Sequence, residues 1–174
     1  MIGAAVALML AASAPAAPDP AAVDAFLRRA GAATGAPVRI DMARTMGRNQ
    51  DISRKITEQV LAGEKRATLA REAEFVEKGW PLPRPGQIVL VYDFEGKPSF
   101  IYRVVAAQVL PLGSVAPWHL MTESPALRDL SAWRKAHLGL WKDAIAGMSP
   151  DEVERMPVVW TRFEPVFPAA SPPR

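Results

Sequence analysis

The chain has 174 residues and a formal net charge of +3, with 49% hydrophobic and 22% charged residues. This composition is typical of one globular domain with a hydrophobic core, and the length leaves little room for a second. The chain has no cysteine, which excludes disulfides, thiolate nucleophiles and cysteine-built zinc or iron–sulfur sites. Two histidines are too few for a histidine-rich metal centre, so we expect neither a metal nor a cofactor.

The positive charge is unevenly distributed. Between residues 44 and 84, nine Lys or Arg residues stand against six Asp or Glu residues, so this stretch accounts for the whole net charge. Such an excess can attract an anionic ligand, although a solvated surface of mixed charges is the simpler interpretation.

The N-terminal residues 1–16 resemble a signal peptide. An uncharged apolar run from Ile2 to Ala14 has the length of such a segment, is too short to span a membrane, and ends in small residues suited to cleavage before Ala17. No positive charge precedes it, and the alternative is an Ala-rich tail on a cytoplasmic protein. With cleavage, the mature protein is periplasmic or secreted and free of the membrane.

The first half of the mature chain predicts helices joined by glycine-containing turns. One helix begins at Asp19–Pro20, a capping residue followed by proline, and ends within 31–37. A short strand is expected over 38–42 and a second helix over 51–62, with Gly63 as its left-handed cap. A short helical stretch reaches residue 78, before a proline-rich loop.

The second half predicts strands around one long helix. An almost continuous run of β-formers over 87–93 is typical of a strand buried on both faces, and a turn at 95–97 leads to a return strand over 99–110. An apolar helix face extends from 127 to 147, and a last strand covers 158–163. Residues 169–174 are expected to be a disordered tail, so the domain spans 17–168.

Several segments together resemble the ASCH domain family. Leu61 to Thr68 is similar to the Gly-x-Lys-x-x-Thr pattern of that family, and Trp133 to His137 is similar to its Trp-Arg-x-Ala-His helix. Further similarities lie in 81–87, 95–98 and 156–164. The resemblance covers roughly residues 23–168 and implies an α+β fold: a PUA-like small β-barrel flanked by helices.

The resemblance also implies candidate catalytic residues. Some small family members hydrolyse acetylated cytidine with a lysine, a threonine and a glutamate, and others have reported ribonuclease activity. The lysine falls on Lys65 and the threonine on Thr68. Glu123 aligns with the first glutamate of an acidic run, whereas Pro125 stands where the hydrolase acid is expected. A shift of one or two residues would give Glu123 that role.

Lys65 and Thr68 can be judged by chemistry alone. A threonine hydroxyl needs an adjacent base to act as a nucleophile, and a lysine is such a base only when burial or a positive neighbour lowers its pKa. Because the two residues are three apart, a regular strand would direct them to opposite faces. The alternative is an exposed Lys65 near the helix end and a Thr68 that is an ordinary strand hydroxyl.

A binding site for a nucleoside needs an aromatic platform, a cation and a hydrogen-bonding edge. The candidate ligand-binding residues are Arg66, Arg71, Trp80, Trp118 and Arg134. By contrast, the apolar helix face that carries Trp133, His137 and Trp141 predicts core residues, with the His137 side chain hydrogen-bonded.

Three functions remain open from the sequence. The first is binding of a nucleoside, an RNA fragment or a similar polar ligand in a cavity at the barrel end. The second is hydrolysis of an acylated nucleoside by Lys65 and Thr68 with Glu123. The third is an exported scaffold domain without catalytic activity. The sequence gives no indication of the oligomeric state.

Overall fold

The computed structural model describes residues 14–168, so the expected tail at 169–174 and most of the expected signal peptide lie outside the described residues. Six α-helices and five strands follow one another along this part of the chain. They are α1 (Pro20–Thr34), β1 (Met42–Arg44), α2 (Gln50–Leu61), β2 (Ala67–Arg71), α3 (Glu72–Glu77), β3 (Ile88–Tyr92), β4 (Pro98–Pro111), α4 (Pro117–Leu120), α5 (Leu130–Leu140), α6 (Pro150–Arg155) and β5 (Pro157–Phe167).

The strands form one mixed sheet in the order β1-β3-β4-β5-β2. The β1–β3 pair is parallel, and the other neighbouring pairs are antiparallel. Strands β1 and β2 are the two edges, and no ladder joins them within the described residues. The expected α+β class is therefore confirmed, whereas closure of the sheet into a barrel is not shown.

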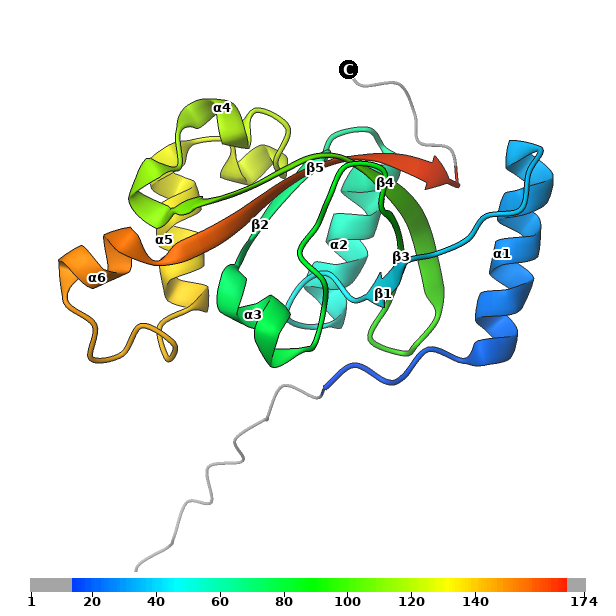
Figure 1. Cartoon of the computed structure of the whole chain (residues 1–174), viewed down its shortest axis with the longest axis horizontal. Coiled ribbons are helices and arrows are strands. Elements are labelled where there is room, and N and C mark those ends of the chain that lie inside the picture. Colours follow the sequence, from blue (N-terminus) through cyan, green and yellow to red (C-terminus); the bar gives the residue numbers. More distant parts are fainter. Residues whose placement is uncertain (1–13, 169–174) are drawn as a thin grey trace, which may run out of the picture.

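Helices cover both faces of the sheet (Figure 1). On one face, which we call the α2 side, Val60 of α2 packs on Val89, Tyr102 and Phe163 of three successive strands. On the opposite face, α1 covers one end of the sheet and α5 covers the other, so these two helices lie at opposite ends of the molecule (Figure 1).

The helix caps follow the expected chemistry. The Asp19 side chain accepts a hydrogen bond from the Ala21 N–H at the start of α1, and Gly35 ends the helix with φ 76°. Asn49 caps α2 through the Ile52 N–H, and Gly63 follows that helix with φ 79°, as predicted. A residue with a Cβ is strained at such a positive φ, so glycine suits this turn.

Several predicted elements differ in their bounds from the structure; the last strand, predicted over 158–163, extends from Pro157 to Phe167. The first strand starts at Met42 rather than near Val38, because Val38 packs under α1 and the Asp41 carboxylate, not a backbone carbonyl, accepts the Ile88 N–H. The helix expected up to residue 147 ends at Leu140, where the backbone of Trp141 leaves helical geometry with φ −95° and ψ 9°.

Among residues 14–168, no helix is both long enough and apolar enough to cross a membrane.

Candidate functional site

The turn after α2 directs Lys65 into the protein. The N–H groups of Glu64 and Lys65 both donate to the Gln59 carbonyl at the end of the helix. The next two N–H groups, those of Arg66 and Ala67, both donate to the carbonyl of Thr122. This backbone contact brings the start of β2 alongside the segment that follows α4.

The contact places Lys65 against Glu123. The Lys65 ammonium and the Glu123 carboxylate form an ion pair, and these residues are only 3% and 1% exposed. The carboxylate also accepts a hydrogen bond of 2.8 Å from the Ser124 N–H. The interpretation of Lys65 as an exposed residue is therefore wrong, and the structure brings Lys65 and Glu123 together.

Burial lowers the pKa of Lys65 from 10.5 to about 7. Removing two charges from water costs several kcal/mol, and the attraction within the pair only partly repays this cost. Such a pair is weak evidence for stability, whereas a buried lysine that titrates near neutrality is typical of sites that move protons.

His137 on α5 is the third titratable group near this pair. Its Nδ1 lies 2.9 Å from the Trp133 carbonyl oxygen, which requires the proton to be on Nδ1, and its ring stacks on that of Trp133. Burial is the main cause that lowers the His137 pKa to about 4; the hydrogen bond to the Trp133 carbonyl partly opposes it, and the positive charge of Lys65 contributes in the same direction as burial. The expectation of buried tryptophans and a hydrogen-bonded histidine on this helix is confirmed.

Arg128 joins the two backbone segments that carry the buried pair, and it was not predicted from the sequence. Its Nε donates to the Glu123 carbonyl at 3.1 Å, and its Nη2 donates to the Glu64 carbonyl. This exposed arginine belongs to no apolar periodicity or motif, so no sequence signal marks it.

Thr68 lies elsewhere. The β2–β5 ladder is regular from Ala67 to Arg71, so the Thr68 side chain is on the same face as Ala70, on the α2 side of the sheet. Its cross-strand partner is Thr161. The described residues include no hydrogen bond between Thr68 and Lys65.

Trp80 lies on the same side of the sheet as Thr68. Its ring packs on Phe75 next to Ala70, and it is half-buried. The guanidinium of Arg44, at the end of β1, lies 4.9 Å from the centre of the Trp80 ring. Arg44 therefore connects the edge strand β1 with the loop that follows β2 and α3 on the other edge. This contact was not predicted from the sequence.

The other predicted binding residues have separate surroundings. Arg71 pairs with Glu74 at 3.5 Å, Arg134 pairs with Glu154, and the half-exposed Trp118 stacks on His119. Arg66 is half-buried beside Lys65. These contacts do not bring the predicted binding residues to one point.

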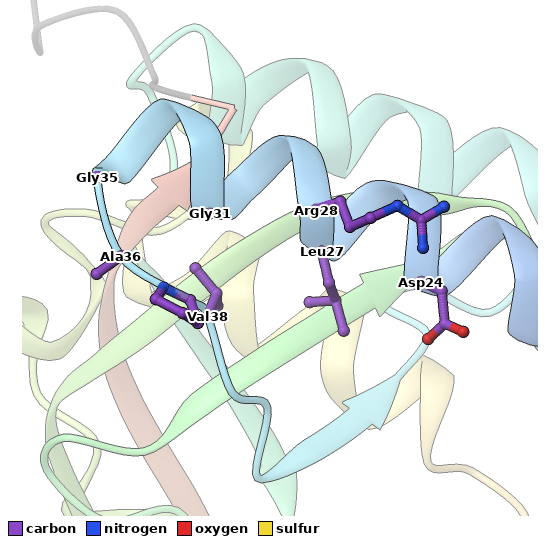
Figure 2. A pocket seen from close by; sticks show the side chains of 8 residues that line it. Asp24, Leu27, Arg28, Gly31, Gly35, Ala36 and Val38 are labelled. Atoms are coloured by element: carbon purple, nitrogen blue, oxygen red, sulfur yellow. The ribbon is translucent and has the colours of Figure 1, made fainter.

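An open surface pocket of ≈ 510 Å³ lies beside α1. Figure 2 shows Asp24, Leu27 and Arg28 on the helix and Val38 on the segment that follows it. None of the predicted site residues lines this pocket. Over residues 14–168, no group of three or more acidic or histidine side chains is arranged to hold a metal ion.

The fold and the site together define an α+β domain with polar and aromatic groups on the α2 side and a buried lysine–glutamate pair at the start of an edge strand. A family model described as the ASCH domain matches residues 43–167, which is most of the chain, so the protein belongs to the PUA-like ASCH domain family. The expected membership is confirmed.

Solved structures agree with this assignment. An ASCH domain from Lactobacillus crispatus JV V101 is 20% identical, with a TM-score of 0.66 over 84% of this chain and 94% of that chain. A protein from Enterococcus faecalis V583 is 19% identical, with a TM-score of 0.66 over 84% of this chain and 91% of that chain. At this identity the likeness shows a shared fold. A search of the curated proteins finds no match.

Proposed function

We propose that this ASCH domain binds a nucleoside, either free or at the end of an RNA fragment, on the α2 side of the sheet beside Trp80. The observation that carries the proposal is the contact of Arg44 with the Trp80 ring at 4.9 Å, on the side of the sheet that also carries Thr68. An aromatic face, a cation and a hydroxyl are the groups that nucleoside recognition requires.

The chemistry of each group suits this role. Stacking of a base on an aromatic ring contributes about 1–3 kcal/mol and tolerates any base. Lys78 also lies over the Trp80 ring, at 4.5 Å, and is an exposed side chain that a base displaces at little cost. The hydroxyls of Thr68 and its partner Thr161 can donate and accept hydrogen bonds, as the edge of a base requires.

Calorimetric titration with cytidine, N4-acetylcytidine and adenosine tests the proposal. Trp80→Leu and Thr68→Val should each weaken binding, the first by about tenfold or more because it removes the stacking surface. Trp118→Leu is the matched control, because this half-exposed tryptophan contacts His119 and Trp160 instead. The proposal fails if no nucleoside binds, or if Trp118→Leu weakens binding as much as Trp80→Leu.

Hydrolysis of an acylated nucleoside is the second candidate, and the buried Lys65–Glu123 pair favours it. A neutral Lys65 would take the proton of the Thr68 hydroxyl, which attacks the acyl carbon. The acyl group passes to Thr68, the amine leaves with a proton, and water releases the carboxylic acid. The regular ladder from Ala67 onward counts against this route, because it holds Thr68 on the α2 side.

Turnover of N4-acetylcytidine to cytidine and acetate tests this candidate. Lys65→Met, Glu123→Gln and Thr68→Val should each reduce turnover by about a hundredfold or more if the three residues act together. Binding without turnover in the unaltered protein would contradict hydrolysis and support only the binding function. Neither binding nor turnover in a well-folded protein would favour a scaffold role.

Export is a separate part of the proposal. It rests on the uncharged apolar run from Ile2 to Ala14; in the structure the Ala16 N–H donates to the Phe94 carbonyl, a contact that cleavage before Ala17 would remove. N-terminal sequencing of the protein from its native cell should find a start at Ala17. A retained Met1 would contradict export and would favour a cytoplasmic RNA ligand.

A further inference from the structure

Arg44 is a buried cation without an acidic partner. It is 9% exposed, and none of the ion pairs among residues 14–168 includes it. By comparison, the buried Lys65 has Glu123 and the half-buried Arg71 has Glu74. A buried charge is costly unless it is paired, so the missing counter-charge at Arg44 requires an explanation.

The contacts of Arg44 leave part of its guanidinium available. Its Nε donates to the Thr45 carbonyl at 3.3 Å, and it also interacts with the hydroxyl of the buried Tyr102. The rings of Trp80 and Phe75 stabilise the cation from 4.9 and 5.8 Å, but they do not neutralise it. A guanidinium has five N–H donors in a planar fork that matches two oxygens of a phosphate.

A buried hydroxyl without a hydrogen-bond partner lies on α2, the helix that covers the same side of the sheet. Ser53 is 1% exposed, and its hydroxyl has no hydrogen-bond partner. It is in the first turn of α2 and, with Val60, is one of the two fully buried residues of that helix.

The sequence also shows an excess of positive over negative charge in this region, because residues 44–84 account for the whole net charge of the chain. Arg44, Ser53 and Trp80 all belong to this stretch. The α2 side of the sheet therefore offers a cation, an unpaired hydroxyl and an aromatic ring, with no carboxylate paired to the cation.

We infer that the ligand of this site is a nucleotide rather than a neutral nucleoside, with its phosphate held by the Arg44 guanidinium and its base against Trp80. This inference rests on the proposed binding function and adds the charge of the ligand to it. Trp80 is half-buried and Lys78 is exposed, so both are accessible to a ligand from solvent.

Paired titrations test the inference. Cytidine is compared with cytidine 5′-monophosphate, adenosine with adenosine 5′-monophosphate, and inorganic phosphate is titrated alone. The unaltered protein should bind each nucleotide about tenfold or more tighter than its nucleoside. Arg44→Gln should remove this difference, because it weakens nucleotide binding much more than nucleoside binding. Arg48→Gln, which removes the same charge from an exposed position nearby, should keep the difference.

The outcomes separate this inference from the proposed function. Equal binding of nucleoside and nucleotide by the unaltered protein overturns the inference and leaves the proposed function standing. Arg44-dependent binding of phosphate without nucleoside binding supports the anion site and overturns the nucleoside site. If no probe binds, both fail.

A more conservative variant covers the case in which Arg44→Gln does not fold. Arg44→Lys keeps the positive charge but loses the bidentate hydrogen bonding of the guanidinium, so it should bind nucleotide more weakly than the unaltered protein. Its circular dichroism spectrum should stay the same. In the unaltered protein, added salt should weaken nucleotide binding more than nucleoside binding. A nucleotide preference that neither Arg44→Lys nor salt reduces would overturn the inference.

Discussion

At the scale of single residues, the two central cations of this domain are buried in different ways. Lys65 shares its surroundings with a carboxylate and an imidazole, whereas Arg44 is surrounded by aromatic rings and a tyrosine hydroxyl. A lysine can respond to burial by losing its proton, but an arginine stays charged. Proton transfer is therefore a role for Lys65, and binding of an anion is a role for Arg44.

The burial of Lys65 makes the stability of the protein depend on pH. Because its pKa is about 7 in the folded state and 10.5 when unfolded, the unfolded state holds an extra proton between these values. The free energy of unfolding should therefore rise from pH 7 towards pH 10.5, by up to about 1.4 kcal/mol per unit, and this contribution is lost as the pH falls to 7.

Urea denaturation at pH 7, 8 and 9 measures this contribution. Lys65→Met should show a flatter dependence on pH than the unaltered protein, and Lys55→Met, at an exposed position on α2, should not. Equal slopes for the unaltered protein and Lys65→Met would mean that the attraction of Glu123 keeps Lys65 charged over this range.

At the scale of the elements, the turn after α2 determines where Lys65 lies. Gly63 has φ 79°, so a side chain there strains the backbone. Gly63→Ala should destabilise the protein by about 1 kcal/mol, whereas Gly139→Ala, near the end of α5 with open space around it, should stabilise it by up to about 1 kcal/mol. Denaturation midpoints check both changes, and a neutral Gly63→Ala would show that the turn tolerates another conformation.

Some elements could be predicted because their signals are local. Asp19–Pro20 begins α1, Gly63 follows α2, and the β-forming run at 88–92 with the turn at Gly96 gives the β3–β4 hairpin. The early end of α5 could not be predicted from its apolar face, because the buried Trp141 continues the same apolar spacing beyond the last helical residue.

The candidate site was only partly predictable. Lys65 and Thr68 follow from the Gly-x-Lys-x-x-Thr pattern, but the ion pair with Glu123 depends on a contact between chain segments almost sixty residues apart. Arg44 ends a three-residue strand, and nothing in the local sequence indicates that its guanidinium reaches Trp80. Residue type and spacing thus identified candidates, whereas their partners required the fold.

At the scale of the whole molecule, α1 lies outside the part of the chain that defines the family. The family match starts at residue 43, after this helix. The helix nevertheless covers the sheet, because Phe26 and Ala30 pack on Leu90 and Ile101, and the Phe26 ring meets that of Phe167 edge to face at 5.1 Å. It therefore shields an apolar patch of strands β3 and β4.

Loss of the Phe26 ring should detach α1 before the sheet unfolds. Phe26→Ala removes a side chain that is 5% exposed and should lower the free energy of unfolding by about 3–5 kcal/mol. Arg29→Ala, which removes only a cation over the same ring at 5.4 Å, should cost less than about 1 kcal/mol.

In hydrogen exchange of Phe26→Ala, the amides of α1 should lose protection while those of β4 and β5 keep it, because β4 and β5 are held by their own ladder. Simultaneous loss of protection in the helix and the sheet would instead show that α1 and the family-matched region unfold as one cooperative unit.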